Sequence, residues 1–330
     1  RHVTVYGQTE ITRDLIEVSF VNDTPQYRSG DTREAGTDTI RGNDGRDVIF
    51  GDHGLVWQVP GTNRITSTGD YARIESTDFG AGVRDFLYGN DGDDIIIGGN
   101  GNDDIELGEG NNIGFGDNGL VDWTMRDGDN KSIDLIQTVA AVVGGNDMIT
   151  AGSGNDVALG GQGVDTINLG TGTNIILGDA GRITGYASGA GLGSLELTLD
   201  TIVSTDATSG DGDVITANTG SDYIVAGTGN DRVIIAGDSQ SPDVIFGDHA
   251  QIKFRVAVAG DNTAVILAAR SAFVALGGND EIDTTGGGDV VVGGVGTDTI
   301  TGDGGNDIVF GDNGTLRGFV DGPVGSALIS

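Results

Sequence analysis

The sequence predicts an all-β protein, a parallel β-solenoid that carries regularly inserted β-hairpin arms. Two nested periods lead to this prediction. A nine-residue unit, Gly-Gly/Asp-x-Gly-x-Asp-x-U-x with U a large aliphatic residue, recurs along the chain, and runs of about four units recur roughly every 65 residues. Glycine is abundant, at 61 of 330 residues, and proline is rare, at 4, which excludes a proline-rich linker.

Each nine-residue unit divides into a turn and a strand. Its first six residues are too rich in glycine for a strand interior, and glycine readily adopts the positive φ of tight turns. Its last three residues, such as Thr299, Ile300 and Thr301, alternate as a short strand whose middle aliphatic side chain faces inward. The phase of the units therefore predicts inward-facing aliphatic ladders from Ile40 to Val309.

The units divide the chain into one long solenoid and two flanks. Residues 1–35 are interpreted as the end of an insertion, with a strand and a linker. The solenoid is expected to be continuous over residues 36–314, and residues 315–330 are interpreted as the start of a further insertion. Each insertion inside the solenoid has an outgoing strand, a polar tip and a returning strand, which predicts a β-hairpin that projects from one place. These insertions lie at about 55–79, 120–141, 182–207 and 251–274.

The aspartate at the sixth position of the unit indicates metal binding. It ends the turn beside glycine carbonyl groups, so stacked units offer carboxylate and carbonyl oxygens at a regular spacing. Ca²⁺ accepts six to eight such oxygen ligands in flexible geometry. No His or Cys recurs at this spacing, which disfavours zinc and copper. We therefore expect several calcium ions as the cofactor.

The charge of the chain limits its partners. The formal net charge is −33, which argues against nucleic acid and anionic lipid as partners and for bound cations. A merely soluble acidic surface is the alternative, but the placement of Asp in the turns favours cations. The longest apolar run, residues 264–269, is too short for a membrane span. Cysteine is absent, so a metal rather than a disulfide would have to stabilise a secreted fold.

The units at 42–50, 89–97, 98–106, 160–168, 293–301 and 302–310 resemble the RTX (repeats-in-toxin) nonapeptide. This resemblance implies a right-handed parallel β-roll of two sheets, in which two nonapeptides make one coil and Ca²⁺ lies between turns on the same side. By position, it implies as ligands Asp38, Asp47, Asp85, Asp94, Asp103, Asp147, Asp156, Asp165, Asp213, Asp222, Asp231, Asp243, Asp280, Asp289, Asp298 and Asp307.

Two further groups of residues modify this pattern. Asn112 and Asn174 stand where the sixth-position Asp is expected, so we expect a weaker site or none there. A Gly-Asp pair follows each run of units, and its aspartate either binds a further calcium ion or caps the turn. We call these residues the exit aspartates: Asp52, Asp117, Asp179, Asp248 and Asp312.

The sequence favours a structural function over an enzymatic one. It contains no HExxH, no GxSxG and no Cys nucleophile. We expect a calcium-stabilised segment of a secreted or cell-surface bacterial protein, such as an adhesin stalk or an extracellular matrix filament, that stacks end to end and folds only with calcium. One alternative is the export and folding module of a toxin or secreted hydrolase, which the resemblance suggests. Another is glycan binding by the projecting arms.

Overall fold

The computed structural model describes residues 17–21, 24–28, 35–59, 71–80, 82–126, 130–185, 197–237, 240–255, 265–302 and 304–318. Contacts divide the chain into two units, Arg1–Ala35 and Gly36–Ser330. In the first unit, β1 (Glu17–Val21) pairs antiparallel with β2 (Thr24–Arg28). The described part of the second unit contains strands and turns and no helix.

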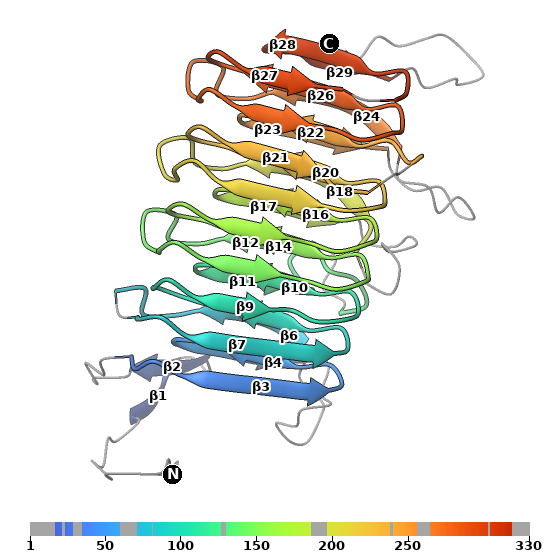
Figure 1. The fold of residues 1–330 in the computed structure, drawn as a ribbon. Helices are drawn as coiled ribbons and strands as arrows, with labels where there is room; N and C mark the ends of the chain where they lie inside the picture. The colour runs from blue at the N-terminus through green and yellow to red at the C-terminus, as the bar shows by residue number, and fades with distance from the viewer. Residues whose placement is uncertain are drawn as a thin grey trace, which may run out of the picture. The chain divides into compact units, whose positions relative to one another are not determined.

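Two parallel sheets of nine strands form the roll, as the repeat predicts (Figure 1). The outer sheet contains β3 (Thr39–Asp44), β7 (Phe86–Asp91), β9 (Asp104–Glu106), β13 (Met148–Thr150), β15 (Thr166–Asn168), β19 (Val214–Ala217), β21 (Arg232–Ile235), β25 (Glu281–Asp283) and β27 (Thr299–Thr301). The middle sheet contains β4 (Val48–Phe50), β8 (Ile95–Ile97), β10 (Ile113–Phe115), β14 (Val157–Leu159), β16 (Ile175–Leu177), β20 (Tyr223–Val225), β22 (Val244–Phe246), β26 (Val290–Gly294) and β28 (Ile308–Asp312).

The insertions build a third sheet, which the sequence did not lead us to expect. Each insertion contributes two antiparallel strands, and these also pair with strands of the neighbouring insertions. The result is one antiparallel sheet of nine strands, here called the insertion sheet. It contains β5 (Gly54–Gln58), β6 (Tyr71–Ser76), β11 (Gly119–Asp122), β12 (Leu135–Thr138), β17 (Gly181–Gly185), β18 (Leu199–Ser204), β23 (Ala250–Phe254), β24 (Ile266–Ser271) and β29 (Thr315–Arg317).

The three sheets keep step because of the spacing of the insertions. One coil uses one strand of the outer sheet and one of the middle sheet, and an uninterrupted coil advances 18 residues, as from Asp85 to Asp103. The next coil contains an insertion and advances 44 residues, from Asp103 to Asp147. One insertion therefore supplies two strands for every two coils. Because strands are about 4.8 Å apart in any sheet, the insertion sheet grows at the same rate as the roll.

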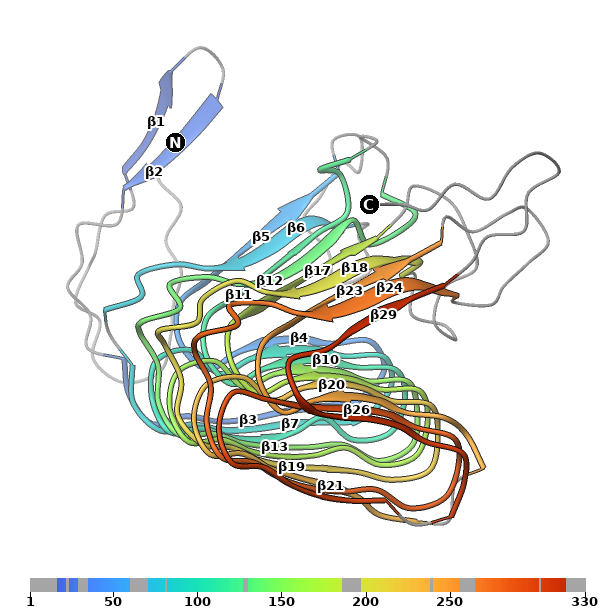
Figure 2. The same ribbon diagram turned by 90° about the horizontal axis from the view of Figure 1, so that it is seen from above.

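Two hydrophobic cores separate the three layers, which Figure 2 shows end-on. The inner core lies between the outer and middle sheets and contains the predicted ladder, including Leu87, Ile96 and Ile105. The second core lies between the middle and insertion sheets and contains Ile95, Ile97 and Trp123. Middle-sheet strands inside the stack are thus buried on both faces, as the run Ile95–Ile97 shows, whereas β28 at the end of the sheet is largely exposed.

Several expectations concern residues outside the described part of the chain. The tips of the insertions, at 60–70, 127–129, 186–196 and 256–264, are among them, so for the arms of the glycan-binding alternative the structure describes the paired strands but not the tips. Most of 1–35 and residues 319–330 lie outside it as well. Among the described residues, no helix has the length and apolar character needed to cross a membrane.

Candidate metal centres

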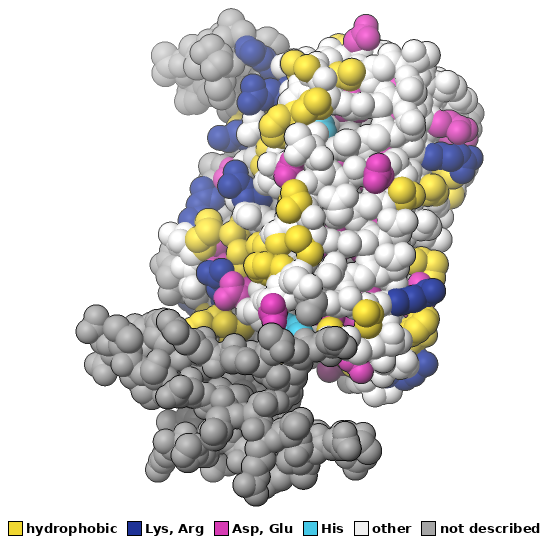
Figure 3. Space-filling model, turned by 90° about the vertical axis from the view of Figure 1, so that its left-hand side faces the viewer, with side chains coloured by type: hydrophobic (Ala, Val, Ile, Leu, Met, Phe, Trp, Pro, Cys, Tyr) yellow, Lys and Arg dark blue, Asp and Glu magenta, His cyan; other side chains and the backbone are white. Residues whose placement is uncertain are grey.

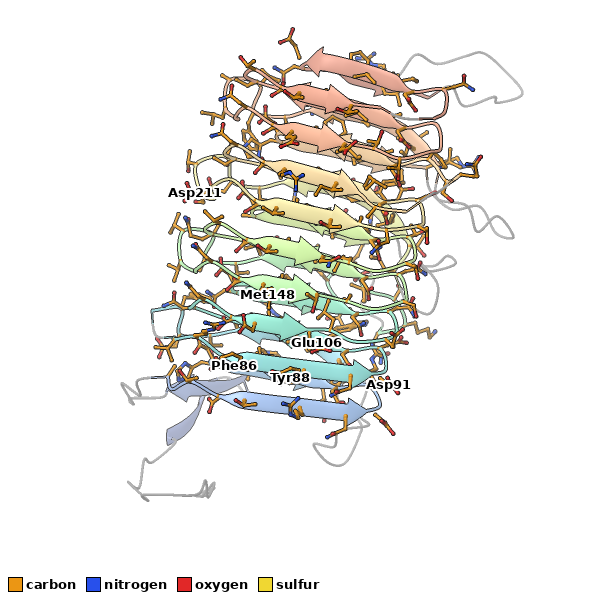
Figure 4. All side chains as sticks on the ribbon, viewed as in Figure 1. Phe86, Tyr88, Asp91, Glu106, Met148 and Asp211 are labelled. Carbon is orange, nitrogen blue, oxygen red and sulfur yellow. The ribbon has the colours of Figure 1, made fainter. Side chains whose placement is uncertain are left out.

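The turns form two edges of the roll, and each edge aligns equivalent side chains. At the first edge the chain enters the outer sheet, and at the second edge it enters the middle sheet (Figure 4). The sixth residue of each unit immediately precedes a strand, so stacking places these residues in columns. The first column is Asp38, Asp85, Asp103, Asp147, Asp165, Asp213, Asp231, Asp280 and Asp298. The second column is Asp47, Asp94, Asn112, Asp156, Asn174, Asp222, Asp243, Asp289 and Asp307.

In each column, one oxygen of every side chain after the first accepts a hydrogen bond in a ladder. In the first column, the backbone N–H of Asp85 donates to Oδ1 of Asp103, one coil further along, at 2.7 Å. The second column repeats this contact between the Asp47 N–H and Oδ1 of Asp94, also at 2.7 Å. The same bond joins every successive pair, at donor–acceptor distances from 2.6 to 3.1 Å. The ladder fixes the orientation of each carboxylate.

The other oxygen of most column aspartates is buried and has no hydrogen-bond partner among the described residues. Asp47, Asp85, Asp94, Asp103, Asp147, Asp156, Asp165, Asp213, Asp222, Asp231, Asp243, Asp280 and Asp298 all leave Oδ2 in this state. A buried polar atom without a partner is costly, and a buried charge more so. The repetition of this feature along both edges indicates that a cation belongs beside Oδ2.

Glycine at the first position of the unit makes room for this cation. A methyl group added to Gly89 would overlap both Asp94 Oδ2 and the Leu107 carbonyl oxygen. At Gly160 it would overlap Asp165 Oδ2 and the Gly178 carbonyl oxygen. A carboxylate oxygen and a carbonyl oxygen therefore border the same small space. Both are hard oxygen donors, the type that Ca²⁺ prefers.

Burial makes the bare carboxylates of the columns unfavourable. Without a cation, burial raises the pKa of Asp103 and of Asp156 to about 7 and that of Asp231 to about 9. The charges of neighbouring aspartates raise these pKa values further, whereas the ladder hydrogen bonds lower them. A divalent cation would reverse the balance because an adjacent positive charge favours the ionised form.

The two asparagines of the second column occupy the ladder without offering a second ligand oxygen. Oδ1 of Asn112 accepts the Asp94 N–H at 2.9 Å, as an aspartate would. Its Nδ2 donates to Oδ1 of Asp156 at 3.0 Å and to the Gly110 carbonyl at 3.3 Å. Asn174 repeats this pattern, with Nδ2 directed at the Gly170 carbonyl at 3.3 Å. The amide hydrogens thus occupy carbonyl oxygens that a cation would need.

The same part of the second edge is also apolar. Leu107 and Leu169 stand where the first-position glycine is expected, and both are fully buried in the inner core. Ala151 and Ala217 replace the same glycine in the units between and after them and pack against the same core. The middle of the second edge is therefore held by apolar packing and amide hydrogen bonds. The first edge keeps an unbroken column of aspartates.

The exit aspartates bind backbone amides of the coils that follow. Asp117 accepts the Gly145 N–H on Oδ1 at 2.9 Å and the Gln162 N–H on Oδ2. Asp248 does the same with two later amides, those of Gly278, at 2.9 Å, and Val295. Asp52 and Asp179 each accept one amide, from Asn100 and Thr228, whereas Asp312 is exposed in the last described coil. Both oxygens of Asp117 and of Asp248 accept amides, which favours capping at these two residues. At Asp52 and Asp179 the other oxygen, Oδ1, is buried without a hydrogen-bond partner among the described residues, the same feature that marks the column aspartates.

The family comparison matches this repeat directly. The model of the RTX calcium-binding nonapeptide repeat matches residues 34–54, 79–113, 143–182, 208–234 and 283–315. These repeats belong to the RTX calcium-binding family. Searches of curated proteins and of solved structures gave no match. The RTX assignment accounts for the two columns and leaves the insertions, which lie largely between the matched segments, unexplained.

The RTX residues of this chain fit calcium. Within the described residues, no group of three or more His, Asp or Glu side chains is arranged to hold a metal ion by itself. A cation at either edge would therefore combine column carboxylates with turn carbonyl oxygens, and such mixed oxygen sites suit Ca²⁺. When bound, the ion would neutralise the carboxylates and join successive turns.

Asparagines of the turns form a second hydrogen-bond ladder, which was not predicted from the sequence. Oδ1 of Asn146, at the fifth position of its unit, accepts the Val164 N–H at 3.0 Å. At the second edge Asn155 accepts the Thr173 N–H at 2.7 Å. The recurrence of Asn before the column residue was the available signal. These bonds satisfy turn amides without using the column side chains.

Proposed function

We propose that this chain is a calcium-stiffened structural segment of a secreted or cell-surface bacterial protein. The observation that carries the proposal is the repetition of one buried, unpartnered carboxylate oxygen per coil along the first edge. Identical sites at successive levels join each coil to the next, which is the arrangement expected of a stiff rod. The described residues offer the same small set of ligands at each coil rather than one specialised centre.

The insertion sheet supports a mechanical role. It runs along the whole stack beside the roll, and its strands pair from β5 to β29 without interruption. Three sheets with hydrogen bonds in one common direction resist bending and stretching better than two. RTX repeat proteins are typically secreted by bacteria, and the acidic, cysteine-free composition is compatible with an extracellular place where calcium is plentiful.

End-to-end stacking is the second part of the proposal. Within the described residues, each of the three sheets has a terminal strand at either end of the roll. These strands are β3, β4 and β5 at one end and β27, β28 and β29 at the other. The ladder has a direction, so Asp38 and Asp47 present Oδ1 acceptors at one end and Asp298 and Asp307 present N–H donors at the other. Unlike ends therefore complement each other. Because β5 and β29 are both outgoing strands, a returning strand is needed between them to keep the insertion sheet antiparallel.

The first test is circular dichroism during a calcium titration of the whole chain. We expect the β-sheet signal to be largely absent in excess chelator and to appear cooperatively as calcium is added, because the carboxylate columns require the ion. Magnesium is the matched control, since it prefers rigid octahedral sites with several waters and should restore much less signal. A full β-sheet signal in chelator would contradict the proposal.

The second test is sedimentation velocity in saturating calcium. End-to-end stacking predicts elongated species whose size grows with protein concentration. A compact monomer at all concentrations would refute stacking and leave calcium stiffening in place.

A further inference from the structure

The outer face of the insertion sheet carries an unusual concentration of positive charge. Side chains alternate along each of its strands. Register-matched side chains form a central row that enters the second core, and the rows on either side of it face away from that core. From β17 to β29 these two outward rows contain four cations, and their other members are neutral. The cations are Arg182, Lys253, Arg270 and Arg317, and we call them the basic strip.

The basic strip is exposed and forms a line along the roll. All four side chains are exposed, and Figure 3 shows Lys and Arg gathered along its left-hand border in the upper half. Arg270 hydrogen-bonds the neutral Gln251, at 2.7 and 3.0 Å. The strands involved are consecutive in the sheet, so the strip spans about 19 Å at about 4.8 Å per strand. Asp200, which lies beside it, is paired with Arg126 at 3.2 Å.

The other half of the same face is neutralised internally. Arg73 on β6 forms ion pairs with Glu75 and with Asp122, the latter at 3.9 Å. These residues lie in the same two outward rows as the basic strip. The excess positive charge is therefore confined to the C-terminal half of the sheet, in a chain whose net charge is −33.

A complementary line of carboxylates lies on another surface. Asp44, Asp91 and Glu109 occupy the third position of three successive turns at the second edge, and all three are exposed. Asp44 and Asp91 are register partners, as are Asp91 and Glu109, so the carboxylates follow the roll at one per coil. Figure 4 shows Asp91 at the end of β7, at the second edge. We call these three residues the acidic line. The turn that contains Asp44 of the acidic line also contains a cation, Arg46.

We propose that the basic strip binds the acidic line of a second copy of this chain, so that rolls associate side by side with a stagger. The basic strip and the acidic line both run along the roll, and both have the spacing of stacked strands. Several basic side chains can therefore lie opposite several acidic ones. The strip lies towards the C-terminal end of the roll and the acidic line towards the N-terminal end. The contact is heterologous, and such contacts build open arrays unless the rotation closes them.

The net charge does not prevent this contact. Calcium bound at the two columns would offset the charge of the column carboxylates, most of which are buried. At physiological salt the remaining charges act over about 8 Å, so the local lines decide the contact. Association should therefore require calcium and weaken as salt is raised.

Two charge-reversed variants test the proposal. The strip variant carries Arg182→Glu, Lys253→Glu and Arg270→Glu, and the line variant carries Asp44→Lys, Asp91→Lys and Glu109→Lys. Each alone should self-associate about tenfold more weakly or worse than the parent, because like charges then face each other. An equimolar mixture should recover association, since each reversed line finds an unlike partner. The measurement is sedimentation velocity in saturating calcium at low and high salt.

A control separates this contact from general charge effects. Arg84→Glu and Arg232→Glu alter two exposed cations away from the basic strip, one in a turn of the first edge and one on β21 of the outer sheet, and should leave association unchanged. Circular dichroism with calcium checks that every variant folds, which keeps this test independent of the calcium proposal. A monomeric parent, unchanged association of the strip variant, or failure of the mixture would overturn the inference. Loss of dextran sulfate binding by a strip variant that still self-associates would instead assign the strip to an acidic polysaccharide.

Discussion

The backbone N–H of Asp85 donates to Oδ1 of Asp103 at 2.7 Å, and Oδ2 of Asp103 is buried without a hydrogen-bond partner among the described residues. One carboxylate thus has two roles. Oδ1 joins successive coils through the backbone, and Oδ2 faces the space beside the Gly98 position. Replacing the aspartate by asparagine preserves the first role and removes the second, which gives a clean way to separate them.

The first prediction uses this difference at the centre of the first column. Asp165→Asn should retain the hydrogen bond from the Asp147 N–H and place an amide nitrogen where the cation belongs. We expect the calcium midpoint to rise and the free energy of unfolding in saturating calcium to fall by about 1–3 kcal/mol, the cost of a poorly satisfied buried polar group. Urea unfolding and a calcium titration followed by circular dichroism measure both effects.

Asp156→Asn is the matched control for this substitution. Asp156 lies between Asn112 and Asn174 in the second column, where neighbouring turns already lack a second ligand oxygen. The calcium midpoint should change little. An equal rise for both variants would show that the two columns contribute alike.

The second prediction restores the missing carboxylates. The double variant Asn112→Asp and Asn174→Asp should bind more calcium than the parent, because each substitution replaces an amide donor with a ligand oxygen. Without calcium it should be less stable, since two more carboxyl groups are buried. Isothermal titration calorimetry gives the stoichiometry. A stoichiometry equal to that of the parent would mean that Leu107 and Leu169 also exclude the ion.

The sequence was sufficient for the columns and for the inner core. The phase of the unit placed Asp85 and Asp103 in one column and Leu87 and Ile105 in one core, because stacking equivalent units aligns equivalent residues. In this part of the fold the nine-residue pattern alone determines which residues stack, so the pairing of the insertions did not have to be known.

The insertion sheet was not predicted because it depends on pairing between distant segments. A signal was nevertheless present. Ile95, Ile96 and Ile97 are all apolar, whereas Asp104, Ile105 and Glu106 alternate, and such runs alternate along the chain. A continuous apolar run indicates a strand covered on both faces. The rows that bring Lys253 near Arg317 could not be inferred, because they depend on the register of separate insertions.

The second core also changes the energetic argument for calcium. One inward aliphatic residue per nine predicts a core too small to offset the ordering of the chain. Units of the middle sheet bury three residues instead, as at Ile175, Ile176 and Leu177. The disorder of the calcium-free chain stays a prediction. The prediction is strongest for the turns of the first edge, because the buried Oδ2 atoms of their carboxylates have no hydrogen-bond partner among the described residues.

The third prediction concerns pH in the absence of calcium. Burial raises the pKa of Asp103 to about 7 and that of Asp231 to about 9, from a usual value of 3.8. The folded roll therefore binds these protons more tightly than the unfolded chain does. Their contribution to stability is complete below pH 3.8 and is lost as the pH rises through 7 to 9. In chelator, the β-sheet signal should be larger at pH 5 than at pH 8.

Saturating calcium should reverse this pH dependence. The ion binds the ionised carboxylates, so acidification must compete with it, and stability should fall as the pH drops. Thermal unfolding at several pH values, with calcium and with chelator, measures both trends. The same pH trend in both conditions would show that the ion does not bind at the column carboxylates.

The fourth prediction tests the space beside the carboxylates. Gly160→Ala adds a methyl group that overlaps the Gly178 carbonyl oxygen and Asp165 Oδ2, so calcium affinity should drop at this level. Gly80→Ala is the control, because no atom lies within 4 Å of the added carbon and the backbone there needs no positive φ. Calorimetry should show weaker calcium binding for the first variant and parental binding for the second. Parental binding by both would place the ion elsewhere.

The fifth prediction separates capping from metal binding at the exit aspartates. Both oxygens of Asp117 accept backbone amides, those of Gly145 and Gln162, and the side chain is buried. In Asp117→Asn the new Nδ2 faces one of these N–H donors, so we expect a loss of about 1–3 kcal/mol in stability at saturating calcium with an unchanged calcium stoichiometry. Asp312→Asn, at an exposed position of the last described coil, should lose far less. If Asp117→Asn instead lowers the number of ions bound, Asp117 is a ligand, and the insertions begin at a metal site rather than at a cap.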